Sequence, residues 1–194
     1  MLAFSRITSI LLFVLSLSFL TCALPTSATH LNALATRDRG ADLLKICVDL
    51  EADVRAKVNA IVIADVNALV DVQADVQVIV DRINVAARAI VAVGLNLNIS
   101  ADIRAQIAIH IAAVIKLVVQ LSIDLVGRLG VTVLLGLLLQ IDLSLRGLLL
   151  AVRGVVVGLL RVVIALLADI TVKVLVGIHL DLSLKVLVPL GLSI

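Results

Sequence analysis

The sequence predicts an all-α protein, an antiparallel bundle of long, hydrophobic, amphipathic helices. Over most of the chain polar side chains recur in steps of three and four, as from Asp102 through Gln106 to His110, and this is the period of one helix face. The whole chain contains two prolines and no Asn-Gly or Asp-Gly pair, so the usual signals of β-hairpins are missing. Alanine, a good helix former, is frequent in the first half.

Residues 1–23 have the pattern of an export signal. Arg6 supplies the positive charge, an apolar segment follows, and Thr21 to Ala23 provide the small residues that a signal peptidase requires. We expect cleavage after Ala23 and a secreted protein, extracellular or in the cell wall. A single membrane anchor is the alternative, although the apolar segment is short for a spanning helix. Residues 24–40 show little periodicity and are expected to be a flexible leader.

The rest of the chain divides into two predicted helical halves. Residues 41–93 are moderately polar, with eight acidic and five basic residues, whereas the hydrophobic half, 94–194, carries five acidic and eight basic residues in almost twice the length. In the first half apolar residues keep helical spacing, which predicts one long helix or a pair of helices from about 41 to 92.

The hydrophobic half is expected to form three further helices, at about 100–127, 132–168 and 170–187. Polar and apolar residues alternate strictly at 94–110 and 169–187, which is also the pattern of a half-buried strand. An i, i+4 repeat satisfies both periods, so β-rich segments at these two places remain the alternative.

Small residues follow one line along the predicted helix 132–168. Glycine and alanine let two helix backbones approach closely, so this line, the small-residue seam, is expected to be the packing seam of the bundle. Gly154 and Gly158 also form a small-xxx-small pair, for which a membrane dimer contact is the alternative; three arginines spaced along this segment argue against a bilayer crossing. The seam consists of Gly136, Gly147, Ala151, Gly154, Gly158 and Ala165.

Two single residues stand out in the mature chain. Cys22 lies within the predicted signal, which leaves Cys47 as an unpaired cysteine. We expect Cys47 to be a small buried hydrophobic residue, with an intermolecular disulfide as the alternative. Asn98 begins the triplet Asn-Ile-Ser and is a candidate site of N-glycosylation.

The sequence contains none of the common catalytic motifs. The sequence has no Gly-x-Ser-x-Gly elbow, phosphate-binding glycine loop, Cys-x-x-Cys pair or His-Glu-x-x-His helix. We therefore predict no catalytic residue, no cofactor, no metal site and no small-molecule substrate, and we expect that the protein is not an enzyme. A formal net charge of +2 and the near absence of aromatic residues argue against binding of nucleic acid.

The excess of aliphatic residues is the main indication of function. Apolar residues make up 62% of the chain, more than one folded monomer is expected to bury, and large exposed apolar patches bind partners, lipid or an interface. The sequence predicts a secreted, non-enzymatic, surface-active or structural protein that self-associates at the cell wall or at a hydrophobic–hydrophilic interface. The alternatives are a lipid carrier or peripheral membrane-binding protein, and a membrane-disrupting effector.

The segment from Asp42 to Cys47 and the aliphatic run at 148–167 carry a resemblance. Through them the chain resembles small secreted hydrophobic cell-surface proteins of mushroom-forming fungi, which act beside the hydrophobins at the hyphal surface. The resemblance is compositional and covers most of the mature chain. It implies a structural role in aerial growth and attachment. The cysteine-rich pattern of hydrophobins themselves is absent.

Overall fold

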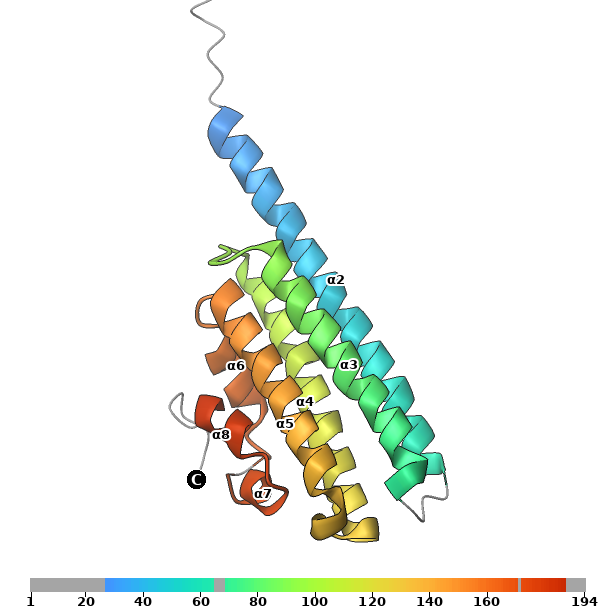
Figure 1. The fold of residues 1–194 in the computed structure, drawn as a ribbon. Helices are drawn as coiled ribbons and strands as arrows, with labels where there is room; N and C mark the ends of the chain where they lie inside the picture. The colour runs from blue at the N-terminus through green and yellow to red at the C-terminus, as the bar shows by residue number, and fades with distance from the viewer. Residues whose placement is uncertain (1–26, 65–68, 171, 188–194) are drawn as a thin grey trace, which may run out of the picture. The chain divides into compact units, whose positions relative to one another are not determined.

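The computed structural model describes residues 27–64, 69–170 and 172–187, and every regular element in them is a helix. The contacts divide the chain into two units, Met1–Ala35 and Thr36–Ile194, and the helix bundle lies in the second. The all-α prediction is confirmed for the described residues. The helices (Figure 1) are α2 (Ser27–Ile63), α3 (Leu69–Val93), α4 (Ala101–Leu129), α5 (Val131–Val155), α6 (Leu159–Leu166), α7 (Val172–Gly177) and α8 (Asp181–Leu187).

Helices α2 to α5 run alternately in opposite directions and form the bundle (Figure 1). Helix α5 packs against α3 and α4. Two ion pairs join α2 to α3: Lys57 to Asp75, with Nζ 3.3 Å from Oδ1, and Arg82 to Asp53, with Nη1 3.4 Å from Oδ2. The moderately polar half and the hydrophobic half of the sequence therefore share one bundle rather than packing separately.

The first two helices are separate, as one of the two predictions for this segment requires. Helix α2 ends at Ile63 and α3 begins at Leu69. The apolar residues on the predicted face of this pair are buried, among them Leu50, Val54 and Ile83. Helical spacing in the sequence thus identified both the elements and their inward faces.

Helix α2 begins at Ser27, within the predicted flexible leader. The prediction of an irregular backbone is therefore wrong for residues 27–40. Residues 27–39 contain neither proline nor glycine, and extending an existing helix is easier than nucleating one, so nothing in this segment stops the helix. The predicted export signal at 1–23 lies outside the described residues.

Helix α4 agrees with the helix predicted at 100–127. Ser100 caps its start, because the side-chain oxygen accepts a hydrogen bond from the N–H of Ile103 at 3.4 Å, and Asp102 in the first turn favours the positive end of the helix dipole. The strand alternative at 94–110 is wrong: the chain has no strand there and turns helical at residue 101.

The single helix predicted at 132–168 is instead two helices. Helix α5 ends at Val155 and α6 begins at Leu159. Between them Val156 is extended, with φ −126°, and Gly158 adopts the left-handed conformation, with φ 79°. A run of β-branched valines followed by glycine has low helix propensity, so the helix breaks here, and α6 packs against α4.

The segment predicted as a weaker helix at 170–187 contains two short helices, α7 and α8. His179 separates them with a left-handed φ of 58°. The strand alternative at 169–187 is wrong for the described residues, which contain no strand. Helix α8 packs against α5 and α7.

The core of the described residues is aliphatic throughout. Its buried apolar members are leucine, isoleucine, valine and alanine, together with Cys47. None of the described residues is Phe, Tyr or Trp, so packing depends on interlocked branched side chains. Loss of one buried leucine from such a core costs about 2 to 5 kcal/mol.

Candidate functional site

A row of leucines lies on the solvent side of α5. Leu135, Leu139, Leu143 and Leu150 are spaced four, four and seven residues apart, which places them on one side of the helix. Each is 44 to 53% exposed. We call these four residues the α5 leucine face. An apolar row of this kind on a solvated helix is a candidate interaction surface.

The small-residue seam also lies largely outside the core. A methyl group added at Gly136, Gly147 or Gly158 would meet no atom within 4 Å, and one at Gly154 would meet only the Leu95 side chain, at 3.5 Å. Of the two alanines in the seam, Ala151 is buried and Ala165 is exposed.

The prediction that the seam packs the bundle is therefore wrong within one chain. The buried face of α5 is formed instead by large aliphatic residues, because removing them from water contributes more than close approach of glycines. These are Leu134, Leu137, Leu138, Ile141, Leu145, Leu148, Leu149 and Val152.

Three arginines flank the exposed apolar row. Arg146 and Arg153 are exposed on α5, and Arg161 is exposed on α6. Because the helix breaks before Arg161, only two arginines belong to α5, which corrects the expectation of three on one helix. In the described part of the chain none of the three forms an ion pair with a carboxylate. We call them the arginine group.

Arg153 and Arg161 border a hollow at the break between α5 and α6. The hollow has a volume of about 400 Å³, and Val156, Val157, Gly158 and Leu160 complete its lining. Two guanidinium groups at the rim of an apolar hollow can bind a ligand in which an anionic group is attached to an apolar part.

Asp142 is the one acidic residue of α5, and it is buried. Its Oδ2 accepts a hydrogen bond from the N–H of Leu182 at 2.7 Å, and its Oδ1 accepts from the N–H and the hydroxyl of Ser183 at 2.8 and 2.6 Å. Asp142 therefore caps the start of α8 from a different helix. No pattern in the sequence predicts this contact, because the partners of Asp142 lie forty residues further on.

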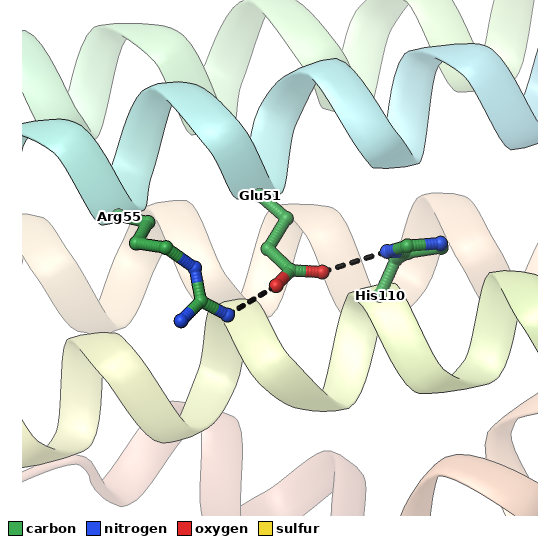
Figure 2. A network of polar contacts seen from close by, with 3 residues as sticks. All are labelled: Glu51, Arg55 and His110. Atoms are coloured by element: carbon green, nitrogen blue, oxygen red, sulfur yellow. Dashed lines mark hydrogen bonds and ion pairs between the residues drawn. The ribbon is translucent and has the colours of Figure 1, made fainter.

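A polar cluster joins α2 to α4 (Figure 2). The Oε2 atom of Glu51 lies 2.6 Å from Nδ1 of His110, and Oε1 of Glu51 accepts a hydrogen bond from Arg55 one turn further along α2. Burial opposes the charge on Glu51, but the hydrogen bonds and positive charges of His110 and Arg55 outweigh it and hold the pKa of Glu51 below its usual value.

This histidine–carboxylate pair has no nucleophile to activate among the described residues. Cys47, one turn before Glu51 on α2, is fully buried, and burial raises the pKa of its thiol to about 12. It therefore stays protonated and inaccessible. We interpret the cluster in Figure 2 as a contact that holds α2 against α4. The described residues also contain no group of three or more His, Cys, Asp or Glu side chains that could hold a metal ion.

Cys47 lies in the bundle core, where the sequence predicts a small buried hydrophobic residue. Its side chain is fully covered, so an intermolecular disulfide would require the helices around it to separate.

Asn98 lies in the loop between α3 and α4 and is exposed. The loop is held to the end of α5, because the N–H of Leu97 donates to the carbonyl of Val155 at 2.7 Å. Asn98 is thus accessible for a glycan on a well-anchored loop, and Ser100 of the same triplet caps α4.

A second groove lies between α4 and the start of the C-terminal segment. It measures about 450 Å³, and its apolar lining includes Leu117, Ile123 and Ile170. Lys116 and Asp169 form an ion pair at its rim, with Nζ 3.0 Å from Oδ2, and the hydrogen bond from Lys116 lowers the pKa of Asp169. The two basic side chains that line this groove, Lys116 and Arg55, are thus both paired with carboxylates, unlike those of the arginine group.

Comparison with known proteins gives no match to a family model, to a curated protein or to a solved structure.

Proposed function

We propose that this protein is a secreted, non-enzymatic, surface-active protein that self-associates at the cell wall or at a hydrophobic–hydrophilic interface. The observation that carries the proposal is the α5 leucine face, four half-exposed leucines in one row on a stable helix. The apolar excess of the sequence and its resemblance to fungal cell-surface proteins point in the same direction. The export pattern of residues 1–23 supports secretion.

The leucine face sets the strength of adsorption for one closed bundle. Burying a whole leucine contributes about 1.5 to 3 kcal/mol, and about half of each of the four is still exposed. Their burial at an interface therefore contributes roughly 3 to 6 kcal/mol. This gain is similar to that of one myristoyl chain, which binds a membrane reversibly.

Reversible adsorption of single copies is the reason to include self-association. A durable coat requires either more apolar area per copy or contacts between neighbouring copies. Exposed apolar side chains also occur on other helices, for example Ile63 on α2 and Ile109 on α4. These side chains offer lateral contacts to neighbours when α5 faces the interface.

Surface tension of a pendant drop tests the proposal. Wild-type protein should lower the surface tension at micromolar concentration. The double variant Leu139→Gln/Leu143→Gln keeps good helix formers on α5 and should need at least about tenfold more protein for the same effect. The matched control is Val85→Gln/Val91→Gln on α3, whose side chains are 58% and 48% exposed in the parent. If folded wild-type protein leaves the surface tension equal to that of the buffer alone, the proposal is refuted.

A second candidate function is peripheral membrane binding or lipid carriage. Helices α4 and α5 are each long and apolar enough to cross a membrane by length and composition, with a mean hydropathy of 1.9, and half of each such segment is buried in the bundle. The groove with the Lys116–Asp169 pair is the place for a carried lipid tail. Co-sedimentation with liposomes together with a gain in helicity, which docking of the closed bundle does not require, would favour this function. Dye leakage from the vesicles would indicate a membrane-disrupting effector.

A further inference from the structure

The charges that α5 and α6 present to solvent are all positive. Together these helices contain four charged residues, Asp142 and the arginine group. Asp142 is 1% exposed and engaged with α8, whereas the three arginines are exposed without a carboxylate partner. Elsewhere in the described bundle several basic side chains are paired, as in Arg55 with Glu51. Helix α8, which packs against α5, adds one exposed acid, Asp181, and one exposed base, Lys185, so the α5–α6 side keeps a net positive charge.

The same side is apolar, and the two properties are interleaved. Along α5 Leu143, Arg146, Leu150 and Arg153 follow one another in steps of three and four, so they lie on one side of the helix. Val157, in the break after α5, is 68% exposed and lines the same hollow as Arg153. A helix side with alternating aliphatic and basic residues is typical of segments that lie in the plane of a lipid surface.

The hollow between Arg153 and Arg161 adds a concave place at one end of this line. It measures about 400 Å³ and its floor is apolar, formed by side chains such as Val156 and Leu160. Guanidinium groups bind phosphate oxygens in pairs of parallel hydrogen bonds. A phosphate that carries an aliphatic tail therefore matches both the charge and the lining of the hollow.

We infer that the α5 leucine face and the arginine group dock on an anionic phospholipid surface. The leucines enter the boundary of the acyl chains, and Arg146, Arg153 and Arg161 bind the phosphates. This inference rests on the proposed function and names its interface. Charge favours lipid over a second copy on this face, since a symmetric contact would bring the same arginines together without an exposed carboxylate from α5 or α6.

Vesicle flotation with the full chain tests the inference. The lipids are phosphatidylcholine alone and phosphatidylcholine mixed with phosphatidylglycerol. Wild-type protein should bind the anionic vesicles more tightly, and added sodium chloride should weaken that binding. The double variant Arg153→Gln/Arg161→Gln should bind them roughly 30-fold more weakly, about fivefold for each basic residue lost.

The control removes the same charge from other helices. Lys45 on α2 and Arg88 on α3 are exposed, and neither pairs with a carboxylate among the described residues. Lys45→Gln/Arg88→Gln should stay within about twofold of wild type, since those side chains lie outside the docked side. Circular dichroism confirms that each variant is folded. Equal losses in the two double variants, or equal binding to both kinds of vesicle, would overturn the inference.

Three further outcomes separate this inference from its rivals. If inorganic phosphate binds the lipid-free protein but neither kind of vesicle does, the hollow is a site for free phosphate and the lipid assignment is wrong. If sedimentation without lipid shows a dimer that Leu143→Gln abolishes, a second copy occupies the face, and the inference fails. A protein that lowers surface tension but binds neither kind of vesicle keeps the proposed function and loses this inference.

Discussion

Replacing Asp142 with alanine removes the acceptor of three hydrogen bonds, from the N–H of Leu182 and from the N–H and hydroxyl of Ser183. Loss of a helix cap costs about 1 to 2 kcal/mol, and a buried N–H without a partner costs about 1 to 3 kcal/mol. Part of this is offset, because the variant no longer buries a charge. We therefore expect a net loss of about 2 to 3 kcal/mol in the free energy of unfolding.

Urea denaturation followed by circular dichroism measures this loss, and hydrogen exchange at 181–187 shows whether α8 opens locally before the bundle unfolds. Asp142→Asn retains one acceptor oxygen and should lose about half as much. Asp81→Ala is the control, since the Asp81 carboxylate is exposed and, among the described residues, accepts only from Gln77 on its own helix. It should cost less than about 0.5 kcal/mol. If the Asp142 and Asp81 alanine variants match in both measurements, the capping role is refuted.

Three further predictions concern other parts of the bundle. Because the folded-state pKa of Glu51 lies below its usual 4.5, the contacts of Glu51 stabilise the fold above that pH, and this contribution is lost as the pH falls below about 4.5. The variant Glu51→Gln should therefore lose less stability on acidification than wild type. An equal loss in urea titrations of the two proteins would contradict the role of the cluster. Gly158→Ala places a Cβ at φ 79° and should destabilise the fold by about 1 to 2 kcal/mol. Gly136→Ala lies within α5 with open space around it and should stabilise the fold by about 0.5 to 1 kcal/mol. If the thermal midpoints of the two variants move in the same direction, the break at Gly158 is disproved. The buried Cys47 thiol, with its pKa raised to about 12, should react with a thiol reagent far more slowly in native than in urea-unfolded protein, and equal rates would show that it is not buried in solution.

The helices could be predicted because their signal is local. Spacing of three and four residues between side chains of one kind is set by the backbone period of the helix itself. Helix α4 therefore appears almost where the pattern placed it, and α3 ends where the first predicted helical segment ends. The pattern was less successful at boundaries. A valine run and one glycine ended α5 early, and the absence of breakers extended α2 toward Ser27.

The sequence alone did not determine which face of α5 is buried. The sequence showed a line of small residues and a line of large ones on the same helix, and either could have packed inward. In the structure the large aliphatic residues are buried, and Gly136 and Gly147 face open space. Which line turns inward depends on the total area that neighbouring helices cover, and that quantity is not encoded in one helix.

The partners of the polar residues were also decided by the tertiary fold. Asp142 meets Ser183, and Glu51 meets His110, across forty residues or more of chain. No spacing rule links such distant positions, because contacts of this kind follow from how helices pair.

The sequence by itself determined that this chain forms helices, that its core is aliphatic and that apolar area remains in excess, since these follow from composition and period alone. Only the tertiary structure decided where that excess lies. Burial of one side of α5 against α3 and α4 left the leucine face on the opposite side, and the capping of α8 by Asp142 left the arginine group as the only exposed charges of α5 and α6 in the described chain.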